Sequence, residues 1–138
     1  MSGNLNIRLS MSYKVPGLEE FPWADYSVEF AILFGSRAGG RLVKGDWDIA
    51  VWLSDQDKYA DLLTALAKFL NVREELIDLI PLNYRLPCVL IIEIFRHRPV
   101  YVRDIERYLD IRFRLQNPCI DFFISRRVLG LGEPPWRL

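Results

Sequence analysis

Three aspartates stand inside segments that otherwise have the character of buried β-strands, and this feature constrains the fold most. Asp46 and Asp48 lie in DWDIAVWL, and Asp78 lies in LIDLIPL. Side chains alternate between the two faces of a strand, so Asp46 and Asp48 share one face. An ionised carboxylate among apolar residues is costly unless it is paired or binds a cation. Three such carboxylates therefore favour a divalent ion, and oxygen ligands of this kind suit Mg²⁺.

A glycine-rich turn precedes the first two aspartates. Residues 28–34 (VEFAILF) predict a buried strand that stops at Gly35, and nine residues separate Ser36 from Asp46. Glycine lets the backbone approach a ligand closely, and a turn that opens a helix directs free N–H groups at an anion. The turn and the aspartates together predict a site for a polyphosphate and its metal ion.

The remaining hydrophobic pattern alternates helices with strands. The apolar residues of one segment recur at helical spacing up to Asn71, which predicts a helix that ends at that asparagine. In the last helical segment, Asn117-Pro118 predicts a kink or a fresh helix start. We therefore expect an α/β (α+β) fold with a small mixed sheet. The predicted elements after the first strand are a strand over 46–53, a helix over 59–70, a strand over 76–82, a helix over 87–98, a short strand over 100–102 and helical structure from 104 onward.

A chain of 138 residues fits one domain. We expect a flexible N-terminal arm over 1–16, the main domain over 17–129 and an irregular C-terminal tail over 130–138. The formal net charge is zero, so overall charge gives no indication of nucleic-acid or membrane binding. The first twenty residues lack the pattern of a signal peptide, and no apolar run reaches about 18 residues. These features predict a cytoplasmic protein.

The two cysteines, Cys88 and Cys119, lie among apolar residues and do not form a CxxC pair. We expect buried reduced thiols rather than a disulfide or a metal site.

The C-terminal third has a local excess of positive charge, which is consistent with a solvated helix face or with a surface for an acidic partner or phosphates. The sequence leaves both interpretations open. Nine arginines (Arg96, Arg98, Arg103, Arg107, Arg112, Arg114, Arg126, Arg127 and Arg137) stand against five acidic residues (Asp104, Glu106, Asp110, Asp121 and Glu133).

The stretch LFGSRAGGRLVKGDWDIAVWL resembles the signature of the polymerase β-like nucleotidyltransferases, a Gly-Ser turn followed by an Asp-x-Asp strand. IDLIPLN resembles the strand that bears their third carboxylate. Within this superfamily the short chain resembles the minimal nucleotidyltransferase (MNT) branch, which in prokaryotes is often encoded beside a HEPN-domain protein. The resemblance runs from about Val28 to Phe123 and implies the polymerase β-like nucleotidyltransferase fold.

The resemblance implies a role for each matching residue. Gly35 and Ser36 match the turn that contacts the triphosphate, and Asp46 and Asp48 match the metal ligands. Asp78 matches the third carboxylate, which binds metal and helps to deprotonate the attacking hydroxyl. The implied cofactors are Mg²⁺, as two ions, with ATP as the substrate.

This chain departs from the family in the loop after the Gly-Ser turn. The family commonly has Ala-Arg-Gly where this chain has Ala38-Gly39-Gly40, so an arginine is missing. We take Arg37 as the candidate that supplies its charge to the nucleotide, with Arg41 and Lys44 as alternatives.

The resemblance implies that AMP is transferred from ATP to a hydroxyl, with a tyrosine of a HEPN-domain toxin as the expected acceptor, so that the chain acts as an antitoxin. One alternative is a non-catalytic antitoxin that neutralises the HEPN partner by binding. Another is an enzyme that modifies a small molecule, although such enzymes usually carry an extra helical domain. The sequence leaves the base preference and the oligomeric state, including a homo-oligomer, open.

Overall fold

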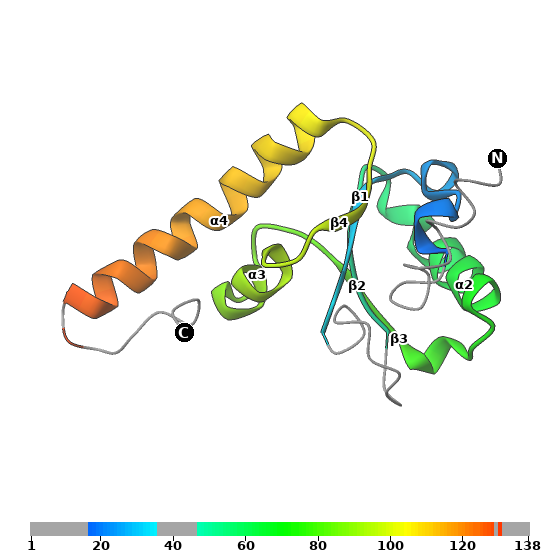
Figure 1. The fold of residues 1–138 in the computed structure, drawn as a ribbon, viewed down its shortest axis with the longest axis horizontal. Helices are drawn as coiled ribbons and strands as arrows, with labels where there is room; N and C mark the ends of the chain where they lie inside the picture. Colours follow the sequence, from blue (N-terminus) through cyan, green and yellow to red (C-terminus); the bar gives the residue numbers. More distant parts are fainter. Residues whose placement is uncertain (1–16, 36–46, 129, 131–138) are drawn as a thin grey trace, which may run out of the picture.

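The computed structural model describes residues 17–35, 47–128 and 130. A four-stranded sheet has helices on both faces, which confirms the expected α/β fold with a small mixed sheet (Figure 1). The strands are β1 (Val28–Phe34), β2 (Trp47–Leu53), β3 (Ile77–Pro81) and β4 (Pro99–Val102). The helices are α2 (Tyr59–Leu70), α3 (Cys88–Phe95) and α4 (Ile105–Val128). Short 3-10 helices in this part of the chain are η1 (Leu18–Glu20), η2 (Trp23–Tyr26), η4 (Gln56–Lys58) and η5 (Glu74–Leu76).

The strands follow the order β3-β2-β1-β4 across the sheet. β1 is antiparallel to both β2 and β4, whereas β2 and β3 are parallel. A parallel pair needs a crossover connection, and α2 lies between β2 and β3 in the chain. Pro81 and Pro99 both lie in edge strands, where the missing N–H of proline is tolerated.

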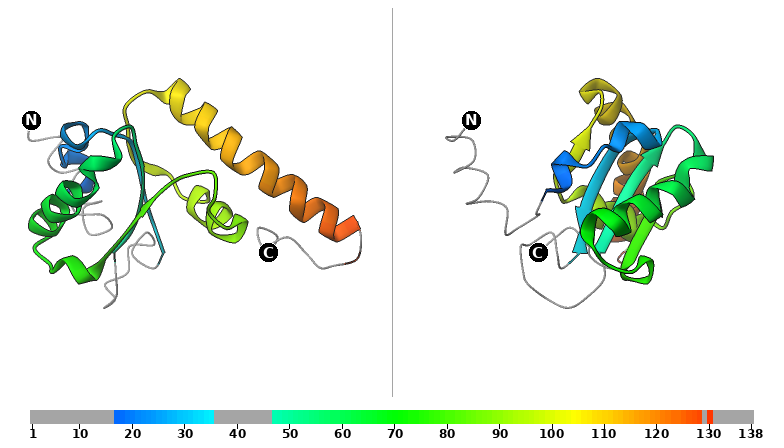
Figure 2. Two further views of the ribbon diagram at one scale, coloured as in Figure 1. Left: turned by 180° about the vertical axis from the view of Figure 1, so that it is seen from behind. Right: turned by 90° about the vertical axis from the view of Figure 1, so that its right-hand side faces the viewer.

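The sheet separates two hydrophobic cores, because successive side chains of each strand point to opposite faces. The views in Figures 1 and 2 show α2, η1 and η2 on one face and α3 and α4 on the other. The first core includes Leu18, Trp23, Val28, Ala31, Leu33, Ile49, Val51, Leu62, Leu66 and Leu79. The second includes Phe30, Ile32, Phe34, Ala50, Ile91, Ile94, Phe95, Tyr108, Ile111 and Leu115.

Local signals define both ends of α2. The side chain of Asp55 accepts a 3.0 Å hydrogen bond from the Asp57 backbone N–H and caps η4, which leads directly into α2. Asn71 follows the helix with a φ of 57°, a left-handed conformation that asparagine tolerates. The predicted end of this helix at Asn71 is therefore confirmed.

Helix α4 begins at a side-chain cap and continues without a break. Asp104 accepts hydrogen bonds from the backbone N–H groups of Glu106 and Arg107 at 3.0 and 3.4 Å. The guanidinium of Arg107 also donates a 2.9 Å hydrogen bond to Glu29 of β1, which ties the helix to the sheet. None of the helices in the described ranges is long and apolar enough to cross a membrane.

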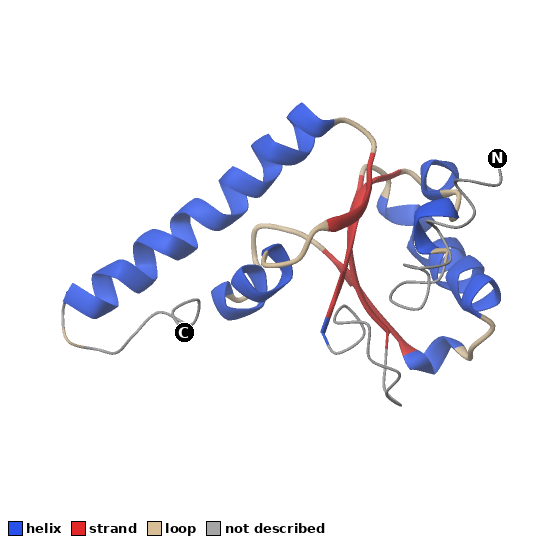
Figure 3. Ribbon diagram, viewed as in Figure 1, coloured by secondary structure: helices blue, strands red, loops and turns tan. Residues whose placement is uncertain are grey.

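The fresh helix start predicted as one outcome at Asn117-Pro118 is wrong, because Pro118 lies inside a continuous α4 (Figure 3). Proline removes one backbone hydrogen bond from a helix interior. Buried residues lie on both sides of the proline, with Leu115 before it and Cys119 after it in the same core. Packing of this face against the rest of the second core outweighs the local preference of proline.

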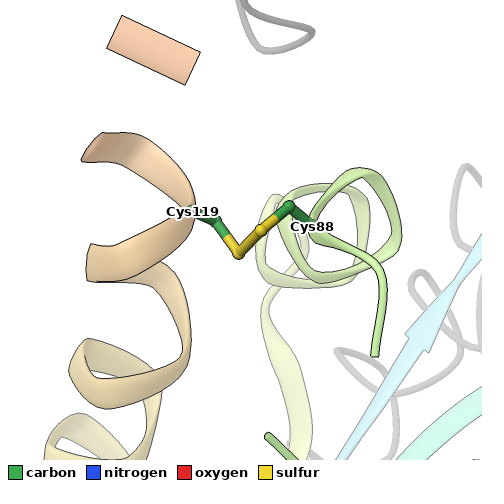
Figure 4. Close-up of a disulfide and its surroundings, with 2 residues drawn as sticks. All are labelled: Cys88 and Cys119. Carbon is green, nitrogen blue, oxygen red and sulfur yellow. A yellow bond between two sulfur atoms is a disulfide. The ribbon is translucent and has the colours of Figure 1, made fainter. Parts of the chain in front are cut away.

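The prediction of reduced cysteines is also wrong. Cys88, the first residue of α3, forms a disulfide with Cys119 of α4, and their Cα atoms are 5.3 Å apart (Figure 4). The sequence does not reveal this pairing, because it depends on how two helices separated by β4 pack together. The disulfide joins the beginning of α3 to the second half of α4.

Candidate active site

Two of the three predicted carboxylates lie side by side in the sheet. Asp48 of β2 and Asp78 of β3 are direct partners in the parallel pairing of these strands. Neighbouring strands lie about 4.8 Å apart, and directly paired residues project from the same face. The structure thus brings together two residues that are separated in the chain by the whole of α2.

The two carboxylates differ in exposure. Asp48 is half-buried, whereas Asp78 is exposed. Both lie on the face of α3 and α4, since Ala50, two residues after Asp48, belongs to the second core. Adjacent carboxylates repel one another, and a cation between or beside them relieves this repulsion.

Gly35 closes the site on the β1 side. Phe34, the last residue of β1, pairs with Asp48, so the chain turns away at Gly35 directly beside that aspartate. Gly35 has a φ of 75°, a left-handed conformation that disfavours other residues. A Cβ at this position would collide with the Asp48 carboxylate and would lie 3.1 Å from its Cγ. Glycine is therefore the residue that lets this carboxylate lie directly against the backbone of the turn.

Tyr59 lies next to the site and was not among the predicted site residues. Its hydroxyl donates a 2.8 Å hydrogen bond to the carbonyl of Leu79, the residue after Asp78 in edge strand β3. Burial raises the pKa of Tyr59 above its usual value of 10.0, and the negative charge of Asp78 raises it further. In the sequence Tyr59 belongs to the apolar stripe of α2, which predicts packing and gives no sign of this contact.

Three predicted site residues, Asp46, Ser36 and Arg37, lie outside the described residues. Within the described ranges, no group of three or more histidine, cysteine, aspartate or glutamate side chains is arranged to hold a metal ion. The described part of the site is therefore the pair Asp48 and Asp78 with Gly35. Asp46 directly precedes β2 in the chain and stays a predicted third ligand.

The residues present fit a magnesium ion. Asp48 and Asp78 offer carboxylate oxygens on one face of the sheet, which is the ligand type and ligand number that Mg²⁺ takes from a protein when phosphates supply others. The Asp48 carboxylate lies directly against Gly35, in the space that a side chain at position 35 would occupy. A phosphate group entering from the turn can share a cation with that carboxylate.

Comparison with family models identifies one match, described as "Polymerase beta, Nucleotidyltransferase", over residues 20–106. This range spans more than half of the chain and contains the strands that carry Asp48 and Asp78. Comparison with curated protein sequences finds no match.

Solved structures with a similar fold come from toxin–antitoxin complexes. A chain from the complex of tri-AMPylated Shewanella oneidensis HEPN toxin with MNT antitoxin is 19% identical, with a TM-score of 0.53 over 77% of this chain and 84% of that chain. A chain from a toxin–antitoxin structure with AMP-PNP is 20% identical, with a TM-score of 0.56 over 78% and 88%. A chain from an MntA-HpeT complex with two aspartate-to-glutamate substitutions is 18% identical, with a TM-score of 0.57 over 78% and 88%. At these identities the similarity shows the fold.

Proposed function

Because this chain belongs to the polymerase β nucleotidyltransferase family, we propose that it transfers AMP from ATP to a hydroxyl group in a magnesium-dependent reaction. We further propose that the acceptor is a tyrosine of a HEPN-domain toxin, which makes the chain an antitoxin. The observation that carries this proposal is the direct pairing of Asp48 with Asp78, with the Asp48 carboxylate packed against Gly35 at the turn after β1.

In this proposal Asp48 and Asp78 hold magnesium together with Asp46. Magnesium supplies charge neutralisation at the phosphates and lowers the pKa of the attacking hydroxyl. Asp78 is the more exposed of the described pair, so it is the carboxylate that an incoming acceptor reaches first. We assign to Asp78 the uptake of the proton from the acceptor hydroxyl.

The turn after β1 positions the triphosphate. The Asp48 carboxylate lies directly against Gly35 at this turn, and in this proposal the Ser36 hydroxyl and the Arg37 guanidinium contact the phosphates. The acceptor oxygen forms a bond to the α-phosphorus while the bond to pyrophosphate breaks. The proton of the hydroxyl passes to Asp78, so the products are the AMP ester and pyrophosphate.

Two of the similar structures support the choice of nucleotide and acceptor. One contains a tri-AMPylated HEPN toxin bound to an MNT antitoxin, and another contains AMP-PNP. AMP attached to a toxin is the product expected from the reaction proposed here. A third similar structure carries paired aspartate-to-glutamate substitutions two positions apart, the spacing of Asp46 and Asp48 in this chain.

A second candidate function is neutralisation of the same toxin by binding alone. The Ala38-Gly39-Gly40 segment favours this alternative, because it lacks the arginine that is common in the family. Adjacent Asp48 and Asp78 oppose it, because a site that binds no cation retains their mutual repulsion without benefit.

The intact mass of the HEPN-domain protein encoded beside this chain separates the two functions. The partner is incubated with the chain, ATP and Mg²⁺, and its mass is compared before and after. We expect an increase by whole AMP units with the wild-type chain and no increase with Asp48→Asn. Asp61→Asn, which changes an exposed carboxylate of α2, serves as the matched control and should transfer AMP like the wild type. An unmodified but neutralised partner in the wild-type sample would leave only binding as the function.

A further inference from the structure

A cavity of about 400 Å³ lies between α3 and α4. This volume is within the range of about 300–1,000 Å³ that small-ligand sites occupy. None of its lining residues belongs to the candidate active site. Its walls combine three apolar side chains, two cationic ones and one neutral amide, namely Ile92, Phe95, Ile120, Arg96, Arg112 and Gln116.

Arg112 is the half-buried cation of this cavity, and its partners in the described part of the chain are all neutral. Its guanidinium donates hydrogen bonds to the Gln116 side chain at 3.0 Å, the Phe95 carbonyl at 3.3 Å and the Tyr108 hydroxyl at 3.5 Å. It also lies 5.8 Å from the centre of the Phe95 ring. These contacts hold the guanidinium in place without a counter-charge.

Tyr108 does not balance this charge. Burial raises the pKa of Tyr108, although the charge of Arg112 and its hydrogen bond act in the opposite direction. The phenol is therefore neutral near pH 7, and Arg112 still lacks an anion. A carboxylate entering the cavity would form charge-assisted and potentially bidentate hydrogen bonds with it.

Arg96 supplies a second cation at the edge of the cavity. Arg96 directly follows α3 and forms a 3.4 Å ion pair with Glu93 of that helix, and the two side chains are 42% and 43% exposed. Exposed pairs of this kind contribute little to stability, so rearrangement of Arg96 toward a ligand costs little.

An exposed apolar row on α4 lies beside the row of residues through which this helix lines the cavity. The cavity-lining residues of α4 are spaced four residues apart and form one row along the helix: Arg112, Gln116 and Ile120. The adjacent row is Ile105, Leu109 and Phe113, since residues three and four apart are neighbours on a helix surface. These three side chains are 58%, 52% and 64% exposed. A run of large apolar side chains in contact with water marks an interaction surface.

We propose that this surface, which we call the α4 docking surface (Ile105, Leu109, Phe113 and the cavity around Arg112), binds a segment of the partner protein. The segment places apolar side chains along the exposed row and inserts one acidic side chain into the cavity to pair with Arg112. The partner is the HEPN-domain protein of the proposed function. Only this choice of partner rests on the proposed function; the location of the surface does not.

Charge favours a different protein over a second copy of this chain. Arg96 and Arg112 line the cavity, and none of its described lining residues is acidic. Two copies joined through this cavity would bring these cations together, whereas an acidic partner segment complements them.

Two variants test this inference. Their binding to the unmodified HEPN-domain protein is measured by calorimetry. Arg112→Gln should weaken binding about tenfold or more, because it removes the charge that the acidic side chain needs. Arg114→Gln is the matched control: Arg114 is 63% exposed, pairs with Asp110 and lies two residues away on the same helix. It should bind like the wild type. Both variants should keep wild-type affinity for ATP with Mg²⁺, which shows that they are folded.

Leu109→Ser provides an independent variant, because this exposed side chain makes little contribution to the core. It should also weaken partner binding while the thermal stability stays the same. If both Arg112→Gln and Leu109→Ser bind the partner with wild-type affinity, the inference is overturned. It is also overturned if the chain self-associates and Leu109→Ser abolishes that self-association. A wild-type chain that binds the partner through this surface but adds no AMP would contradict the proposed function alone.

Discussion

Gly35 lies so close to Asp48 that a methyl group at position 35 would overlap the Asp48 carboxylate. The φ angle of Gly35 is 75°, so its backbone is also in a conformation that favours glycine. Two separate constraints therefore favour glycine at position 35. One is the left-handed backbone, and the other is the contact with the Asp48 carboxylate in the candidate active site. The two can be distinguished by comparing substitutions at different glycines.

Gly35→Ala should lower the free energy of unfolding by about 1–2 kcal/mol because of its left-handed backbone. It should also strongly weaken binding of ATP with Mg²⁺, because the new methyl group displaces the Asp48 carboxylate. Urea denaturation measures the first effect, and calorimetry with a non-hydrolysable ATP analogue measures the second.

Gly17→Ala is the matched control for this substitution. Gly17 has a φ of 74°, and a Cβ there would lie at an ordinary contact distance of 3.4 Å from Phe69. The two variants should therefore lose similar stability, while Gly17→Ala keeps wild-type nucleotide affinity. Equal nucleotide affinity of the two variants would show that Gly35 has only a conformational role.

Asp78→Asn should separate the chemical step from substrate binding. It should reduce the rate of AMP transfer by about 100-fold or more, because it removes the group assigned to accept the proton. Affinity for ATP should fall less, because Asp48 and the turn at Gly35 remain. Single-turnover kinetics at saturating ATP measure the first quantity. A transfer rate close to that of the wild type would remove Asp78 from the chemical step.

The same variant tests the repulsion between the paired carboxylates. Without metal, Asp78→Asn should be as stable as the wild type or more stable by up to about 1 kcal/mol, because it removes one of two adjacent negative charges. Added Mg²⁺ should raise the stability of the wild type and leave that of the variant nearly unchanged. Urea denaturation with Mg²⁺ and with EDTA provides the comparison, and equal responses of the two proteins would argue against a shared metal site.

The pairing of Asp48 with Asp78 shows where sequence patterns stop being informative. Each strand could be predicted locally, and the predicted bounds 28–34 agree with β1 because a continuous apolar run is buried in both cores. The register of two parallel strands depends on how α2 packs, which no local pattern encodes. The disulfide between Cys88 and Cys119 escaped prediction for the same reason.

Pro118 shows a different limit. The local rule that proline ends a helix gives the wrong expectation here, because tertiary packing prevails. The loss of one hydrogen bond did not end α4, because buried residues continue on both sides of the proline. Arg112 shows a third limit. The sequence revealed an arginine excess near the C-terminus, but only the structure distinguishes the half-buried Arg112 from the exposed, paired Arg114.

Tyr59→Phe should lower the free energy of unfolding by about 1 kcal/mol near neutral pH, because the Leu79 carbonyl loses its hydrogen bond. The pKa of Tyr59 is raised in the folded protein, so its contribution is complete below about pH 10 and is lost as the pH rises through the folded pKa. The stability difference between wild type and variant should therefore shrink at alkaline pH. Urea denaturation at about pH 8 and about pH 11 measures it, and a constant difference would contradict the account.

Reduction of the disulfide should destabilise the chain. Cys88 and Cys119 are 31 residues apart, and closing a loop of this length stabilises a fold by on the order of 3–4 kcal/mol. The midpoint of urea unfolding should fall when reductant is added to the wild type. The double variant Cys88→Ala/Cys119→Ala should have this lower midpoint without reductant, and added reductant should not change it. An unchanged wild-type midpoint would show that the disulfide contributes little.

Magnesium-dependent nucleotide binding is the decisive measurement for a metal site that Asp48 and Asp78 form for a nucleoside triphosphate. A non-hydrolysable ATP analogue is titrated into the wild-type chain by calorimetry, once with Mg²⁺ and once with EDTA, and the titrations are repeated with Asp48→Asn. A metal site of this kind should give tight binding only for the wild type with Mg²⁺, and weak binding in the other three titrations. Equal affinity of the wild type with Mg²⁺ and with EDTA would contradict it.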